Sequence, residues 1–168
     1  MKTVEIRKAT PEDAEAACAV VRRSIVELCR ADHQGDAATI AAWLANKTTE
    51  NMCRWIAASH VFVAAQQGRI LGVAAMMPSG EITLNYVSPE ARFRGVSKAL
   101  VRRLEQQATE LGAATTTLKS TLTAVRFYEA AGYCSAGAPT GGFGITSGYP
   151  MTKSLRARTS PPLGEELP

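Results

Sequence analysis

The sequence predicts a single α/β domain, and three observations support this prediction. The chain has 168 residues, 46% of them hydrophobic and 20% charged, which suits one full core but not two. In some segments apolar residues recur every three or four positions, as on one face of a helix. Between these segments lie short apolar runs bounded by turn residues, as in strands. We assign residues 1–155 to the domain, and residues 156–168, with three prolines and no periodicity, to a disordered tail.

The first third of the chain is predicted to be one strand followed by helices. Charged and apolar residues alternate over about residues 3–8, as in a strand. Residues 10–13 (Thr-Pro-Glu-Asp) predict a helix start, because threonine suits the N-cap, proline the first position and acids the first turn. A loop over residues 31–35 then leads to two further helices, which carry Trp43 and Trp55.

The remainder alternates between strands and helices. Strands are predicted over residues 61–65, 70–76, 81–87 and 115–119, with a closing pair over 133–138 and 149–155. Helices are predicted over about residues 95–111 and 122–131, where apolar residues recur at helical spacing. Tight turns separate the strands at residues 67–69 and 78–80.

Composition excludes several classes of protein. No apolar run approaches the roughly 20 residues that a membrane-spanning helix needs, and the N-terminus lacks the apolar stretch of a signal peptide. The four cysteines, Cys18, Cys29, Cys53 and Cys134, lie far apart, which argues against a disulfide scaffold or a zinc site. We therefore expect free thiols in a cytoplasmic protein that has no metal and no membrane partner, with Cys134 buried in a strand.

The net charge of +4 is concentrated in one segment. Residues 92–103 hold five basic residues and no acid, whereas the rest of the chain has fourteen basic and fifteen acidic residues. Nucleic-acid-binding proteins usually spread basic residues over a face and interleave aromatic residues, and neither pattern is present. We therefore expect no nucleic-acid partner, because one compact patch better suits a small polyanion.

The basic patch falls at a predicted helix start. A strand ends near Val87, a short loop follows, and the helix begins at Gly95. The first N–H groups of a helix lack partners and lie at the positive end of its dipole, so they can bind a pyrophosphate. Arg92, Arg94 and Lys98 would add charge-assisted hydrogen bonds. The alternative is a plain helix start with solvated basic side chains, and spacing alone does not choose between the two.

Two segments resemble the GCN5-related N-acetyltransferase (GNAT) superfamily. Residues 92–97 (Arg-Phe-Arg-Gly-Val-Ser) resemble its acyl-CoA-binding motif Gln/Arg-x-x-Gly-x-Gly/Ala, which follows a Val-x-Pro strand end as residues 87–89 do here. Residues 120–133 resemble the family's strand–helix segment that ends in Phe-Tyr-x-x-x-Gly-Phe/Tyr. Residues 6–14 are similar to the family's opening strand and helix start, and the resemblance extends to about residue 155.

The resemblance implies a fold, a co-substrate and a reaction. The fold is a mixed, mostly antiparallel, splayed sheet with helices on both faces. The co-substrate is acetyl-CoA or a similar short acyl-CoA, and the implied binding residues are Val87, Arg92, Arg94, Gly95, Val96, Ser97, Lys98, Ala99, Thr121 and Tyr128. In the reaction, a primary amine attacks the thioester directly. Tyr128 is implied to protonate the leaving thiolate, and Glu81 to act as the general base that an ammonium needs.

Two of these residues depart from the family's pattern. Ser97 stands where glycine or alanine is usual, and Thr121 stands where many members have asparagine. The change at Ser97 affects how the phosphates of CoA would bind. The change at Thr121 affects a side-chain contact to the pantetheine arm. The alternative function is therefore a non-catalytic acyl-CoA-binding or sensing module, although the retained Tyr128 favours an enzyme.

The resemblance implies that the acceptor is a small-molecule or peptide amine. Its class stays open: polyamine, antibiotic, amino acid, peptide N-terminus or protein lysine. A homodimer is one possible assembly.

In the family, the last hairpin lies beside the acceptor channel, and residues 137–148 hold five glycines. A mobile flap with Phe143 over the cleft is one interpretation of this segment, and a hairpin tip without a role is the other. His33 lies where the family shapes its acceptor pocket, but a loop histidine is more often solvated.

Overall fold

The computed structural model describes residues 2–142 and 145–155. Its helices and strands follow one another in this order: β1 (Glu5–Lys8), η1 (Pro11–Asp13), α1 (Ala14–Leu28), α2 (Arg30–His33), α3 (Ala37–Leu44), α4 (Thr49–Ala58), β2 (His60–Gln66), β3 (Arg69–Met76), β4 (Glu81–Val87), η2 (Pro89–Ala91), α5 (Val96–Glu110), β5 (Thr115–Ser120), η3 (Leu122–Ala124), α6 (Val125–Ala130), β6 (Cys134–Ser135), β7 (Thr140–Gly142) and β8 (Ile145–Ser154).

The strands form a mixed sheet in the order β1-β2-β3-β4-β5-β8-β6, and β7 pairs with β8. The β4–β5 pair is parallel, and the other pairs are antiparallel. The expected mixed, mostly antiparallel sheet is therefore confirmed.

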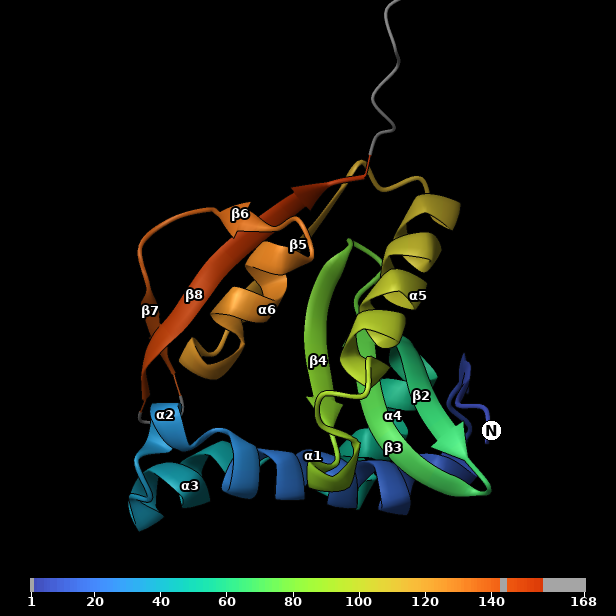
Figure 1. Ribbon diagram of the computed structural model, residues 1–168, viewed down its shortest axis with the longest axis horizontal. Coiled ribbons are helices and arrows are strands. Elements are labelled where there is room, and N and C mark those ends of the chain that lie inside the picture. Colours follow the sequence, from blue (N-terminus) through green and yellow to red (C-terminus); the bar gives the residue numbers. More distant parts are fainter. Residues whose placement is uncertain (1, 143–144, 156–168) are drawn as a thin grey trace, which may run out of the picture.

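The sheet opens between β4 and β5. These strands pair only at Glu81 with Thr117 and at Ile82 with Leu118, and then they diverge. Figure 1 shows the result as two arms that meet near the top and separate below: β1–β4 with α5 on one side, and β5, β8 and β6 with α6 on the other. From Thr83 onward, the edge of β4 that faces β5 has no strand partner among the described residues.

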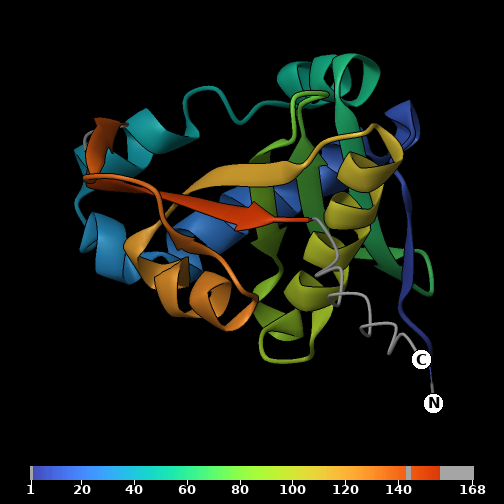
Figure 2. The same ribbon diagram turned by 90° about the horizontal axis from the view of Figure 1, so that it is seen from above.

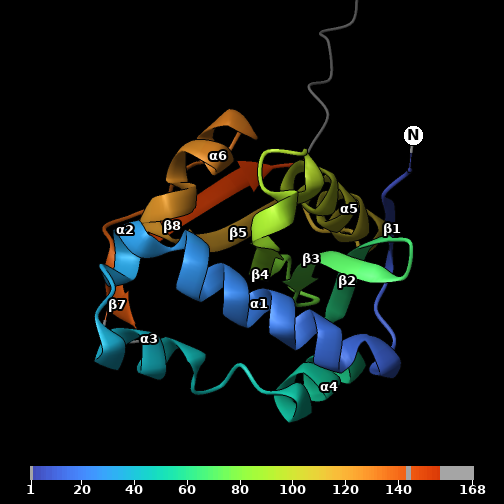
Figure 3. The same cartoon turned by 60° about the horizontal axis from the view of Figure 1, so that its bottom comes forward.

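Helices cover both faces of the sheet because its central strands are apolar on both sides. Alternate residues of β2 belong to two different cores: Phe62 packs in a cluster with Leu100 and Leu104 of α5, and Val63 packs in a cluster with Val21 and Ile25 of α1. Figure 2 shows α4 on the side of the sheet opposite α5, and Figure 3 shows α1 crossing below the sheet beside α4. The prediction of helices on both faces is confirmed.

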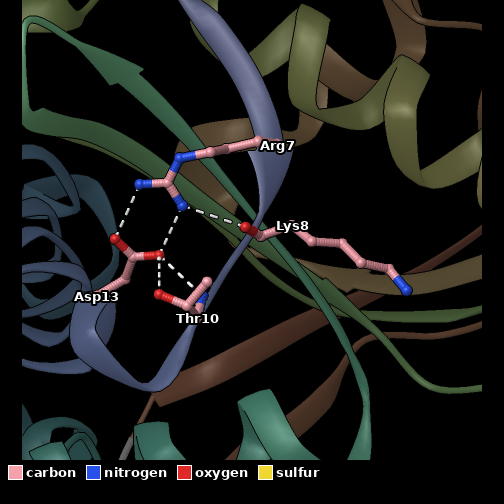
Figure 4. Close-up of polar contacts among 4 residues, drawn as sticks. All are labelled: Arg7, Lys8, Thr10 and Asp13. Atoms are coloured by element: carbon pink, nitrogen blue, oxygen red, sulfur yellow. Dashed lines mark hydrogen bonds and ion pairs between the residues drawn. The ribbon is translucent and has the colours of Figure 1, made fainter.

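Polar contacts hold the corner between β1 and α1 (Figure 4). The guanidinium of Arg7 donates to both carboxylate oxygens of Asp13, at 2.7 and 3.0 Å. The same carboxylate accepts the backbone N–H of Thr10 at 2.8 Å. Asp13 is thus a charged partner and a capping residue at once, as expected for an acid three positions after an N-cap threonine.

Residues 31–35 differ from the predicted loop. The short helix α2 occupies most of this segment, and the ring of His33 is buried instead of solvated. The Nε2 atom of His33 lies 3.0 Å from the carbonyl oxygen of Ile25, and its Nδ1 accepts the N–H of Gly35 at 2.9 Å. The ring of His33 therefore provides hydrogen-bond partners for backbone groups around the end of α1. The turn-like residues of this segment gave no sign of these contacts. Cys134 also differs from expectation, because it is exposed at the sheet edge.

Two predictions fall partly or wholly outside the described residues. The packing of Phe143 over the cleft is one, and the disordered tail over residues 156–168 is the other. Within residues 2–142 and 145–155, no helix combines the length and the apolar character needed to cross a bilayer.

Candidate active site

A first cavity of about 480 Å³ lies where β4 and β5 separate. Four segments supply its walls: β4 at residues 82–87, the η2–α5 segment at residues 91–93 and 95–98, the β5–α6 segment at residues 118–121, 123, 124, 127 and 128, and the end of α1 at residues 24, 28 and 29. The splay of the sheet thus creates a cavity that runs from the start of α5 to the side chain of Tyr128.

The start of α5 presents backbone N–H groups to this cavity. Gly95 is the N-cap residue, in the left-handed conformation (φ 77°), and a Cβ built there would meet no protein atom within 4 Å. The first N–H bonded back into the helix is that of Ala99, which donates to the Gly95 carbonyl at 3.0 Å. The four amides before it, from Gly95 to Lys98, are therefore the available donors.

Two of the ten implied binding residues do not line the cavity. The side chain of Arg94 donates to Oε1 of Gln66 at 3.2 Å, and its N–H donates to the Ala91 carbonyl at 3.3 Å. The N–H of Ala99 is held within the helix. The implied binding residues therefore extend too far at both ends of this segment: a turn before Gly95 uses the N–H of Arg94, and the helical hydrogen bonds begin at Ala99.

The remaining eight implied binding residues line the cavity together. They are Val87, Arg92, Gly95, Val96, Ser97, Lys98, Thr121 and Tyr128. The hydroxyl of Thr121 also accepts the N–H of Ala124 at 3.2 Å, so this residue caps η3 as well.

Tyr128 crosses the cavity from α6 towards β4. Its side chain is buried, and its phenol oxygen accepts a hydrogen bond from Nδ2 of Asn85 at 3.1 Å. Burial raises the pKa of Tyr128 to about 12, against the opposing effect of the Asn85 hydrogen bond. The phenol is therefore protonated at neutral pH, as a general acid must be.

Asn85 is the site residue that sequence reasoning missed. Its Oδ1 is buried and has no hydrogen-bond partner among the described residues. A polar residue in the apolar strand Glu81–Val87, two positions before the strand end, was the available signal. A buried acceptor left open in a cavity wall is suited to an N–H donor of a ligand.

A second cavity of about 420 Å³ adjoins the first. Both are lined by residues 82–84, 86 and 119–121, so they meet at the point where the strands diverge. Glu81 lines the second cavity and not the first, together with Trp43, Lys47 and Trp55 from the α3–α4 region. The structure thus places the predicted acid and the predicted base in adjoining cavities.

Residues 29–155 match the model of the acetyltransferase (GNAT) domain family. The chain belongs to this family. Among curated proteins, none matches the sequence significantly.

Solved structures of other acetyltransferases have a similar fold. A GCN5-related N-acetyltransferase from Rhodopseudomonas palustris has a TM-score of 0.82 and 27% identity, over 92% of this chain and 97% of that one. The PaiA N-acetyltransferase from Thermoplasma acidophilum, in complex with coenzyme A, has a TM-score of 0.76 and 19% identity, over 90% and 99% of the chains. The YncA protein from Salmonella typhimurium, with its cofactor acetyl-CoA, has a TM-score of 0.68 and 19% identity, over 96% and 99% of the chains.

The described residues of this GNAT domain contain no cluster of three or more histidine, cysteine, aspartate or glutamate side chains that could hold a metal ion. The polar groups that line the first cavity include backbone amides, basic side chains, hydroxyls, an amide oxygen and a phenol. These groups fit an anionic ligand that also carries amide N–H groups and a leaving atom that needs a proton.

Proposed function

We propose that this GNAT domain transfers an acetyl group from acetyl-CoA to a primary amine by direct attack. The observation that carries the proposal is the pair of adjoining cavities. One joins the free amides of α5 to the phenol of Tyr128, and the other is lined by Glu81.

The first cavity supports acetyl-CoA as the donor. The amides of residues 95–98, with Arg92 and Lys98, would bind the pyrophosphate. The absence of a Cβ at Gly95 leaves the space that a phosphate needs. Ser97 keeps its backbone amide, so its departure from the family's pattern leaves this binding mode intact.

The open edge of β4 supports binding of the pantetheine arm and the acetyl group. The N–H of Ser88 donates to the Leu71 carbonyl on β3 at 2.8 Å. Because successive strand residues direct their N–H groups to opposite edges, the N–H groups of Val87 and Asn85 face the cavity. One of them would polarise the acetyl carbonyl and stabilise the oxyanion that forms during attack.

The transfer itself requires two proton movements. The amine nitrogen bonds to the carbonyl carbon, the carbon–sulfur bond breaks, and the sulfur takes the phenol proton of Tyr128. Glu81, directly or through water, accepts the proton that the amine loses. Solvent then restores the proton of Tyr128, and the products are an N-acetyl amide and free CoA.

A thiol-release assay with a panel of amines tests the proposal. We expect steady, amine-dependent release of CoA, which should fall by roughly 10²–10⁴-fold in Tyr128→Phe, the range for loss of a general acid. Tyr133→Phe is the matched control, because Tyr133 is a buried tyrosine that bonds Thr116 and Glu105 away from the cavity. Tight CoA binding without turnover of any amine would instead support the sensing module.

A further inference from the structure

The acceptor cavity, as we name the second cavity, combines aromatic side chains with an excess of positive charge. Trp43, Trp55 and Tyr86 supply its aromatic surface. Among the described residues that line it, Lys47 and Lys119 are basic and Glu81 is acidic. The segment between Gly141 and Gly148 contains no charged residue that would change this count.

Lys47 belongs to the cavity wall and not to the solvent-exposed surface. It lies between α3 and α4 and is only 5% exposed. Its Nζ donates to Oδ1 of Asn46 at 2.6 Å and lies 5.9 Å from the ring centre of Trp55. Its backbone carbonyl accepts from Arg22 at 2.8 Å and from the thiol of Cys18 at 3.2 Å, which ties this residue to α1.

This charge pattern discriminates among classes of amine. A polyamine or an aminoglycoside brings two or more positive charges into a cavity that is lined by two lysines and one glutamate. Repulsion between like charges is strongest beside Lys47, because this lysine is buried and water is scarce around it. An acceptor that carries one carboxylate besides its amine has the opposite balance, because the carboxylate faces the lysines and the amine faces Glu81.

Size and surface point to the same class. A cavity of about 420 Å³ is within the range for a small molecule, and its aromatic surface suits an apolar side chain. We propose that the acceptor is a free amino acid or a similarly small amino carboxylate, with its carboxylate at Lys47 and its side chain against Trp43 and Trp55. This inference rests on the proposed acetyl transfer.

Matched pairs of amines test the inference. Phenylalanine and phenethylamine differ by one carboxylate, as do tryptophan and tryptamine, and spermidine represents the polycations. We expect kcat/KM to be at least tenfold higher for the carboxylated member of a pair and lowest for spermidine. Equal or better turnover of phenethylamine, tryptamine or spermidine would overturn the inference while leaving the proposed acetyl transfer in place.

Variants of Lys47 connect this preference to one side chain. Lys47→Met removes the charge at similar length and should remove the preference, whereas Lys47→Arg should retain most of it. Lys8→Met on β1 is the matched control, because it changes the net charge by the same amount at an exposed position outside the cavity. If Lys47→Met does not fold, Lys119→Gln at an exposed position provides the second test, with a smaller loss expected. A preference that survives both variants would contradict the assignment.

A binding measurement separates this inference from the proposed reaction. 3-Phenylpropanoate has the carboxylate and the ring but no amine, so calorimetry reports its binding without any turnover. Saturable binding that falls at least tenfold in Lys47→Met supports the carboxylate site even if no amine is acetylated. The absence of such binding in the wild-type protein would overturn the inference.

Discussion

The side-chain amide of Asn85 on β4 donates a hydrogen bond to the phenol oxygen of Tyr128 on α6, across a distance of 3.1 Å. The two residues are 43 positions apart in the chain, and their bond spans the cavity between the two arms of the sheet. Because Asn85 donates to a lone pair of the phenol oxygen, it does not use the phenol proton of Tyr128. That proton stays available for another acceptor. The same hydrogen bond stabilises the phenolate that remains after that proton has left.

Loss of this hydrogen bond should slow the reaction. We expect kcat to fall roughly 10–100-fold in Asn85→Ala, since a hydrogen bond to a charged group is worth about 1.5–3 kcal/mol. A double-mutant cycle provides the measurement. In the Tyr128→Phe background, Asn85→Ala should have almost no further effect on kcat, because the hydroxyl is already absent. Additive effects of the two substitutions would show that Asn85 acts independently of Tyr128.

Gly95→Ala should weaken the binding of CoA specifically. Gly95 and Gly112 both have a positive φ, 77° and 81°, and an added Cβ meets no protein atom within 4 Å at either position. Alanine should therefore cost similar stability at both sites, roughly 1–2 kcal/mol for a left-handed residue with a side chain. Only Gly95 lines the first cavity. Calorimetry should show weaker CoA binding in Gly95→Ala and unchanged binding in Gly112→Ala. Equal CoA affinities in the two variants would show that the phosphates do not bind at Gly95.

Binding of a carboxylate in the acceptor cavity should weaken as the pH rises from 7 to 9. Burial lowers the pKa of Lys47 to about 8, so its ammonium loses a proton across this range. Burial raises the pKa of the neighbouring Cys18 thiol, which favours its neutral form. Calorimetry with 3-phenylpropanoate should show affinity falling above pH 8, by up to tenfold per pH unit. In Lys47→Arg, where arginine stays charged, the affinity should be nearly independent of pH; the same decline in both proteins would exclude Lys47 as its source.

Asp13 should make the stability of the fold depend on pH. The hydrogen bonds from Arg7 hold the pKa of this carboxyl below its usual value. The folded state therefore gains stability from the ionised form above the unfolded pKa of about 3.9, and that gain is lost as the pH falls through the lower folded pKa. Urea titrations at pH 7 should show a loss of about 1.5–3 kcal/mol in Asp13→Asn, the scale of hydrogen bonds to a charged group.

The difference between wild type and Asp13→Asn should then shrink when the titrations are repeated towards pH 3. Asp36→Asn is a useful comparison, because this N-cap carboxylate is exposed and accepts from Thr39 at 2.8 Å without an ion-pair partner in the described structure. A pH-independent difference at Asp13 would show that shape, and not charge, accounts for its effect.

Local patterns in the sequence determined most of the elements and part of the site. Alternation, short apolar runs and helical periodicity predicted the strands and the long helices to within a few residues, because each pattern reflects which faces of an element are buried. The segment around Gly95 predicted a candidate anion site for a similar reason: a glycine, a helix start and basic residues act over a few consecutive positions. The Phe-Tyr pair placed Tyr128 in a recognisable motif.

Only the tertiary structure decided which distant groups meet. Asp32, in a predicted loop, accepts the N–H of Leu122 at 2.7 Å from a position 90 residues away, and so joins α2 to the start of η3. Asn85 reaches Tyr128, and Lys47 comes to line the same cavity as Glu81. No local pattern encodes these contacts, because they depend on how far β4 and β5 diverge and on how the helices pack against each arm. Periodicity specifies which face of an element is buried, but the partner of a buried polar group is set by the packing of the whole chain.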